Sequence, residues 1–319
     1  MHHFTIICDE TLFRFIEPWR LRDEKQVASR DIATRWVVGL ALQDEGIMDA
    51  LFAFSAFNLR RLNPNDKQLL LASHKYTARA IAAHAEQLRQ ETWKSNVEIV
   101  FAASLLITFI AVHNPWPENK DQLPLHWFQP WQGVRTIVRS SLESFHTHEI
   151  KKLLEVELCQ KLPPPDSTTH NTTFDFLLDG LDYETTDVET VAAYEKNVKR
   201  LSIIYDHPKR DYVFKFAAKV GPRFVQLLDQ KDPRAMTIVG YFFMLLKTVE
   251  EVWWLPRPSG EEFWTLVKLL PVAWRPRMWW AVKEFAAAAN DKGDSVPTPC
   301  KSTCDSSLLL QADCCQLRP

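Results

Sequence analysis

Apolar residues recur at helical spacing along most of the chain, and this pattern predicts an all-α protein. In residues 188–206 they return every three or four positions, at Val191, Tyr194, Val198 and Leu201, so they share one face of a helix. No segment alternates apolar and polar residues cleanly with a period of two, so we expect no sheet. The pattern predicts helices over residues 47–62, 67–93, 97–113, 133–158, 188–206, 212–229, 235–254 and 261–270.

Breaks in this pattern divide the chain into two helical parts. Residues 161–173 (KLPPPDSTTHNTT) are polar and rich in proline, which is typical of a linker. We therefore predict an N-terminal helical half over 1–160 and a C-terminal helical half over 174–289. The composition of residues 290–319 predicts a disordered tail. A loop rich in proline and tryptophan is expected over 115–130.

The segment 232–280 contains half of the chain's 12 tryptophans and a strongly apolar helix. Asp232 suits the N-cap of that helix, and Pro233 suits its first position. From 238 to 252 nearly every helical face is apolar, which indicates a helix buried inside the protein. Pro256 disfavours further helix after the Trp-Trp pair that precedes it.

Several motifs, taken in order, carry a resemblance to a known family. The chain opens with HHFT at 2–5, continues with LFAFSAFNLR at 51–60, and then has a Tyr-Ala-His-Leu helix at 74–88. Near its end come the Asp-Pro-capped apolar helix, a Val-Trp-Trp end and a Trp-x-Pro turn. Together they resemble the regulatory domain of fungal zinc-cluster transcription factors of the sterol uptake control type, over roughly residues 1–285. We expect the chain to lack the six-cysteine DNA-binding module of that family, because Met1 falls inside the opening motif.

The overall charge and the resemblance both bear on whether this chain binds nucleic acid. A chain with a net charge of −2 and scattered Lys and Arg has no electrostatic footprint for nucleic acid. We therefore predict no direct nucleic-acid binding by this chain alone. The resemblance implies a stand-alone regulatory module without its own DNA-binding domain, and it also allows a homodimer.

Composition favours a cytoplasmic or nuclear protein without a membrane span. The longest uncharged apolar run, 99–112, is shorter than the ~20 residues that cross a bilayer, so it is expected to be a core helix. The N-terminal residues do not form a secretory signal. Four of the six cysteines lie in the last twenty residues, which is not the pattern of a secreted disulfide framework.

The search for catalytic motifs is negative, so neither a cofactor nor a metal is expected. The sequence contains no P-loop, dinucleotide fingerprint, nucleophile elbow or HExxH motif. His146 and His148 are predicted to lie on different faces of one helix, which favours a solvated surface over a metal site. The tail cysteines lack the CxxC pairs of structural zinc sites.

Large aromatic residues are the remaining candidates for a site. They either fill a helical core, which composition alone favours, or line an apolar pocket. The resemblance favours the pocket, because regulatory domains of that family hold a sterol in a helical cavity. It implies a sterol, terpenoid or related lipid as ligand. Arg135, His126 and Gln129 lie near residues 127–131 in the sequence, where they either bind a ligand oxygen or are rim or structural groups. The candidate pocket residues are Trp127, Phe128, Trp131, Arg135, Phe242, Phe243, Trp253 and Trp254.

A second function stays open on the same fold. A pocket that holds a polyene or terpenoid in a near-attack conformation could act as a cofactor-free cyclase or pericyclase of fungal secondary metabolism, in the manner of a Diels-Alderase. Orientation alone contributes up to roughly 7–11 kcal/mol in favourable cases, and a hydrogen-bond donor near a conjugated carbonyl adds electrostatic stabilisation. The sequence does not separate this enzyme from a ligand-binding regulator.

Overall fold

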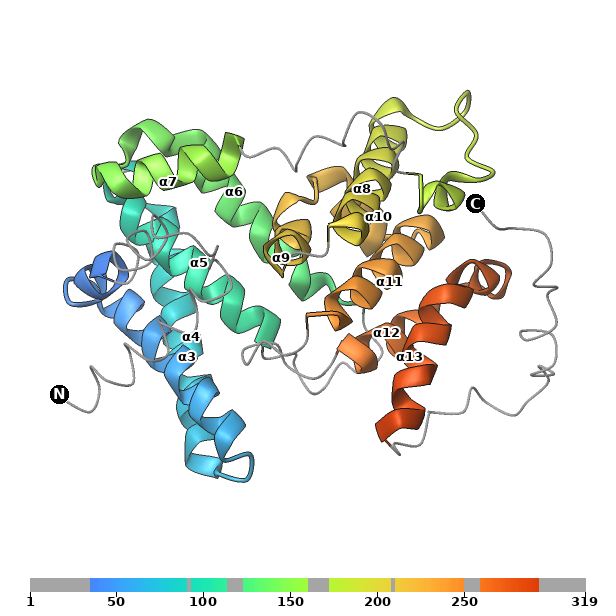
Figure 1. Cartoon of the computed structure of the whole chain (residues 1–319). Helices are drawn as coiled ribbons and strands as arrows, with labels where there is room; N and C mark the ends of the chain where they lie inside the picture. Colours follow the sequence, from blue (N-terminus) through green and yellow to red (C-terminus); the bar gives the residue numbers. More distant parts are fainter. Residues whose placement is uncertain are drawn as a thin grey trace.

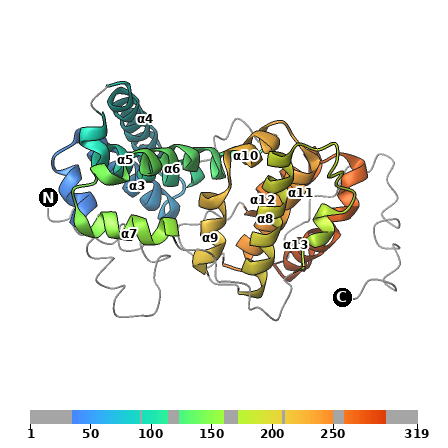
Figure 2. The same cartoon turned by 90° about the horizontal axis from the view of Figure 1, so that it is seen from above.

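A computed structural model describes residues 35–90, 93–113, 123–159, 172–207, 210–249 and 259–292. Every regular element in these ranges is a helix and none is a strand, which confirms the all-α class. Two groups of helices lie side by side (Figures 1 and 2): an N-terminal group from α3 to α7 and a C-terminal group from α8 to α13. The predicted division at the 161–173 linker stays a prediction, because most of that segment lies outside the described residues.

The N-terminal group is built on a hairpin of two long helices. Asp44 caps the start of the first helix by accepting from the N–H of Ile47. Asp66 caps the start of the second by accepting from the N–H groups of Gln68 and Leu69. Its turn points away from the body of the molecule (Figure 1). The elements of this group are α3 (Glu45–Leu62), α4 (Lys67–Arg89), η2 (Trp93–Asn96), α5 (Val97–His113), η3 (Leu125–Trp127), α6 (Gln129–Ser141), η4 (Leu142–Ser144) and α7 (His148–Cys159).

Small residues let the two helices of the hairpin approach closely. A Cβ atom on Gly46 would lie 2.8 Å from the Cβ of Ala83, so glycine at this position permits the close contact. Nearby, Gln87 Nε2 donates to Asp44 Oδ2 over 2.8 Å and ties the end of α4 to the start of α3.

Helix α5 is the core helix of the N-terminal group and packs against α3, α4 and α6. Together with η2 it gives a stretch, Trp93–Val112, that is long and apolar enough to cross a membrane. However, 61% of its most apolar window is buried inside the protein, as expected for the predicted core helix. No other helix among the described residues passes the same test.

Helix α11 passes through the centre of the C-terminal group and contacts α8, α9, α10, α12 and α13. Every residue from Arg234 to Leu246 is buried, which agrees with the burial predicted from its all-round apolar surface. The predicted cap is confirmed, because Asp232 Oδ1 accepts from the N–H of Ala235 over 2.7 Å. The elements of this group are η5 (Asp175–Leu178), α8 (Val188–Asp206), α9 (Arg210–Lys219), α10 (Pro222–Asp229), α11 (Pro233–Lys247), α12 (Ser259–Leu269), η6 (Val272–Met278) and α13 (Trp279–Lys292).

Two of the predicted helices are in fact split. The helix predicted over 212–229 breaks at Gly221, whose backbone is extended, because Pro222 disfavours a helical residue before it and begins α10 instead. The helix predicted over 133–158 breaks between α6 and α7, where Phe145 is buried and extended. The helices predicted over 97–113 and 188–206 are found with the same bounds.

Other predicted boundaries shift in the C-terminal group and the loops. Helix α11 ends at Lys247 rather than 254, and residues 250–258 lie outside the described residues. Only a short apolar turn was expected after Pro276, but α13 forms there and continues to Lys292, past the predicted start of the tail. The loop expected over 115–130 contains η3 and the start of α6.

Candidate functional site

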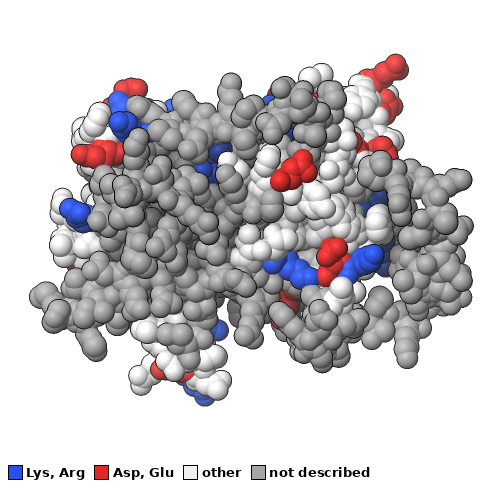
Figure 3. Space-filling model, viewed as in Figure 1, with Lys and Arg blue, Asp and Glu red and all other residues white. Residues whose placement is uncertain are grey.

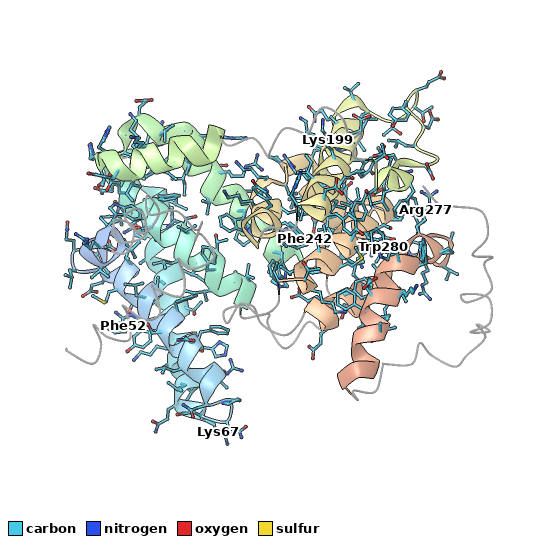
Figure 4. The ribbon with its side chains drawn as sticks, in the orientation of Figure 1. Phe52, Lys67, Lys199, Phe242, Arg277 and Trp280 are labelled. Carbon is cyan, nitrogen blue, oxygen red and sulfur yellow. The ribbon has the colours of Figure 1, made fainter. Side chains whose placement is uncertain are left out.

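Five aromatic side chains from both groups of helices form one contact network, which we call the aromatic cluster. The Trp127 ring lies 6.0 Å from Phe242 and 6.1 Å from Phe243, edge to face. Phe128 contacts Phe242 edge to face at 5.8 Å, and Phe216 stacks on Phe242 at 4.8 Å. All five are buried, so the cluster joins η3 and α6 to α9 and α11; Figure 4 marks Phe242 between the two groups.

The candidate residues are only partly brought together. Trp127, Phe128, Phe242 and Phe243 contact one another, while the pocket that they are expected to line stays a prediction. Trp131 instead packs edge to face on Phe109 of α5, with the ring centroids 5.6 Å apart. Trp253 and Trp254 lie outside the described residues, so their predicted place in the pocket stays a prediction.

A partly buried carboxylate at the edge of the cluster was not predicted from the sequence. Glu262 of α12 accepts from Trp127 Nε1 over 2.6 Å, and a second hydrogen bond of 2.8 Å joins its other oxygen to His126 Nε2. The Glu262 side chain is only 11% exposed. Two adjacent acids in the first turn of a helix suggest a solvated position, so the sequence carried no signal for this contact.

The contacts of Glu262 with His126 and Trp127 give this edge of the cluster its hydrogen-bonding groups. The carboxylate fixes the Trp127 indole in the cluster, because a buried indole N–H needs an acceptor. His126 remains partly exposed on the outer side of the pair. Its ring can therefore exchange a hydrogen bond with a ligand oxygen that approaches from that side.

Arg135, a predicted ligand contact, lies next to the cluster rather than within it. Its guanidinium Nη1 donates to the Val220 carbonyl at the end of α9, which also accepts from Gln132 Nε2 over 3.0 Å. Burial, and then repulsion from Arg139, lowers the pKa of Arg135. Val220 comes one turn after Phe216 and bonds back to it through the backbone, so Arg135 sits where α9 leaves the aromatic cluster.

Another partly buried arginine, Arg200 of α8, was not singled out from the sequence. Burial, and then repulsion from Arg135, lowers its pKa to about 10. Its Nη1 donates to Asn197 Oδ1, one turn earlier on the same helix, over 2.9 Å.

His146 and His148 are both exposed, as expected for a solvated surface rather than a metal site. The prediction that His146 and His148 share one helix is wrong. His148 begins α7, whereas His146 lies in the non-helical segment before it. The N–H groups of His146 and Thr147 donate to Glu98 Oε1 over 2.7 and 2.6 Å, so Glu98 caps the start of α7. Among the described residues, no group of three or more His, Cys, Asp or Glu side chains is arranged to hold a metal ion.

The chain is similar along most of its length to a fungal protein. Over 324 residues, which cover 93% of the chain, it is 30% identical to a protein of Gibberella zeae (strain PH-1) named as a Zn(2)-C6 fungal-type transcription factor. The chain spans 62% of the length of that relative. No protein-family model matches the chain, and no solved structure matches it. The similarity supports the resemblance to fungal zinc-cluster transcription factors.

Proposed function

We propose that this chain is a ligand-binding regulatory domain of the fungal zinc-cluster transcription-factor type. Its ligand is a hydrophobic small molecule, such as a sterol, a terpenoid or a related lipid, held against the aromatic cluster. The similarity to the Gibberella protein supports the regulatory class. The sterol-control resemblance of the sequence motifs supports the ligand class.

The observation that carries the ligand site is the position of the aromatic cluster between two groups of helices. Trp127 and Phe128 come from the N-terminal group, whereas Phe216, Phe242 and Phe243 come from the C-terminal group. A ligand bound here contacts both groups, and it shifts the protein toward whichever arrangement it binds better. Flat aromatic surfaces suit a rigid hydrocarbon skeleton.

In this proposal, DNA recognition belongs to another polypeptide or to a zinc cluster outside this sequence. The net charge of −2 agrees with a module that responds to a ligand rather than to phosphate groups. Such a module works in the nucleus, or in the cytoplasm before it enters the nucleus. Regulation is then a change in how the two groups of helices present their surface to the DNA-binding partner.

Fluorescence and thermal unfolding test the ligand site. Sterols, diterpenoids and linear polyprenols are expected to quench tryptophan fluorescence and raise the melting temperature; a hundredfold excess over Kd adds about 2.7 kcal/mol of stability. Trp127→Phe is expected to weaken both effects. Trp279→Phe is the matched control, because Trp279 is 59% exposed and lies outside the cluster. Absence of both effects across the panel, with folded protein, would overturn the proposal.

The same samples decide between a regulator and the cyclase alternative. Each polyene or terpenoid that binds is incubated with purified protein, without added metal or cofactor, and the products are examined by mass spectrometry and NMR. The regulatory function predicts that the ligand is recovered unchanged. A cyclised product formed with turnover would instead assign the cyclase function to this site.

A further inference from the structure

The hydrogen bonds at Glu262 determine which nitrogen of the His126 ring holds a proton. Trp127 Nε1 donates to Glu262 Oε2 over 2.6 Å, and a second bond of 2.8 Å joins His126 Nε2 to Glu262 Oε1. An ionised carboxylate only accepts hydrogen bonds, so Nε2 is the donor in the second bond. A neutral imidazole with its proton on Nε2 has a lone pair on Nδ1, which makes Nδ1 a hydrogen-bond acceptor.

The Nδ1 atom of His126 is placed to meet a ligand at the aromatic cluster. Among the residues that the structure describes, the one side-chain hydrogen bond of His126 is made by Nε2, and 26% of the side chain is exposed. The ring centroid lies 6.4 Å from that of Trp127, which itself contacts Phe242 and Phe243. A lipid held against the cluster therefore reaches Nδ1 with a polar group at one end.

The other two residues expected near a ligand oxygen are less suited to this contact. Arg135 already donates to the Val220 carbonyl, which ties its guanidinium to the end of α9. Gln129 is exposed at the first residue of α6. Of the three candidates, only His126 combines partial burial with a hydrogen-bonding atom that the fold does not use.

The charge around His126 favours a neutral polar group on the ligand. The Glu262 side chain is 11% exposed, and a carboxylate partly withdrawn from water repels an anionic head group strongly. On the face of the molecule in Figure 3, the charged side chains of the described residues lie in small groups of both signs rather than in one basic patch. A hydroxyl is a neutral group that can donate a hydrogen bond to Nδ1.

We propose that His126, oriented by Glu262, accepts a hydrogen bond from a hydroxyl group of the lipid, so that the site selects alcohols over carbonyl compounds and ethers of the same skeleton. The inference rests on the proposed function, because the apolar part of the alcohol lies against the aromatic cluster. A carbonyl or ether oxygen has lone pairs but no proton, so it forms no hydrogen bond with the Nδ1 lone pair. Glu262 is a positioning residue, because it keeps the proton on Nε2 without contacting the ligand.

Two matched sets of lipids test the selection of alcohols. Cholestanol, cholestanone and cholestanyl methyl ether share one rigid skeleton, whereas geranylgeraniol, geranylgeranial and geranylgeranyl methyl ether share one linear chain. Titration calorimetry uses the full chain in mildly alkaline buffer, which keeps a single proton on a histidine ring. In the set that binds, the alcohol is expected to bind about tenfold tighter than its carbonyl analogue and its ether.

Glu262→Gln is expected to remove the preference for the alcohol while it keeps an acceptor for Trp127. The indole N–H can only donate, so the new amide turns its oxygen toward Trp127 and its NH₂ group toward His126. Nε2 must then accept, and the ring proton moves to Nδ1, which donates to a carbonyl or ether oxygen. Both analogues are expected to bind at least as tightly as the alcohol. Glu261→Gln, at the adjacent exposed position, is the matched control and is expected to keep the preference.

Two further measurements separate the ring of His126 from its surroundings. His126→Phe keeps an aromatic ring but removes Nδ1, and it is expected to lower the affinity for the alcohol to that for the ether. His148→Phe, at an exposed position of α7, is expected to keep the preference. Nitrogen NMR of the free protein reads the tautomer without any ligand: the proton is expected on Nε2 in the wild type and on Nδ1 in Glu262→Gln.

The possible outcomes separate the hydroxyl site from the proposed function. Equal binding of the alcohol, the carbonyl analogue and the ether would overturn the hydroxyl site and leave the hydrophobic ligand site intact. A preference for the alcohol that survives in His126→Phe or in Glu262→Gln would also overturn it, as would a wild-type ring with its proton on Nδ1. Failure of every lipid in both sets to bind would overturn the proposed function, and the hydroxyl site with it.

Discussion

Helices α11 and α4 show how differently apolar residues are used in the two parts of the molecule. In α11, every residue from Arg234 to Leu246 is buried. In α4, which is longer, only Ser73 and Ala80 are buried, and Leu71 is 69% exposed. The contrast follows from position: α11 is surrounded by other helices, whereas α4 forms the outer arm of a hairpin. The number of apolar residues in a helix therefore does not decide how many of them reach the core.

The largest expected effect comes from placing a charge in each helix. Phe242→Asp is expected to abolish soluble, folded protein, because an unpaired charge in a fully buried site costs several kcal/mol. Leu71→Asp is the matched control in α4 and is expected to leave the melting temperature within a few degrees of wild type. Circular dichroism melts of the soluble fractions measure both. A folded Phe242→Asp protein with unchanged melting temperature would show that α11 is not the centre of the core.

The contrast also separates what the sequence predicts from what it does not. Helix α11 was predictable because its apolarity is local information. The same is true of its cap at Asp232 and of the cap of α8 at Asp187, where the side chain accepts from the N–H of Thr190. The contact of Trp127 with Glu262 joins positions 135 residues apart. No local pattern encodes such a pairing. Four of the five residues in the aromatic cluster were candidates from the sequence, because large aromatic residues are usually buried.

The next largest effect concerns the carboxylate at the edge of the aromatic cluster. Glu262→Ala is expected to lower the free energy of unfolding by about 3 kcal/mol, because it leaves the buried Trp127 indole N–H without an acceptor. Glu261→Ala, at the adjacent and exposed position, is expected to change it by less than about 0.5 kcal/mol. Urea denaturation measures both, and equal values for the two variants would contradict the structural role of Glu262.

A smaller effect tests the close contact within the hairpin. Gly46 and Gly260 are both the second residue of a helix, so alanine gains similar helix propensity at each, up to ~1 kcal/mol. At Gly46 the new Cβ would meet Ala83 at 2.8 Å, whereas at Gly260 nothing lies within 4 Å. Gly46→Ala is therefore expected to destabilise by about 1–3 kcal/mol through overpacking, and Gly260→Ala to be neutral or stabilising. The reverse order in urea denaturation would rule out the close approach.

The smallest expected effect on stability depends on pH and concerns Glu98, which joins α5 to the start of α7 through hydrogen bonds. Burial alone raises the pKa of Glu98, but hydrogen bonds from Trp36, Thr147 and His146 outweigh it, so the pKa falls below its usual value of 4.5. A lowered pKa contributes stability that is complete above the usual value and is lost as the pH falls through the lowered one. Glu98→Gln is thus expected to cost about 1–2 kcal/mol at neutral pH and progressively less in acid. A cost that stays constant from neutral pH to about pH 3 would contradict this assignment.

Hydrogen exchange with and without a bound lipid tests most directly whether the ligand lies between the two groups of helices. The amides to compare are those of η3, α6 and the α9–α10 segment, which lie on both sides of the aromatic cluster. The amides of the α3–α4 hairpin are the internal control. We expect a saturating ligand from the fluorescence panel to slow exchange at residues 125–141 and 210–229, and to leave residues 45–89 unchanged. Protection confined to the hairpin, or to one group of helices alone, would contradict a binding site at the aromatic cluster.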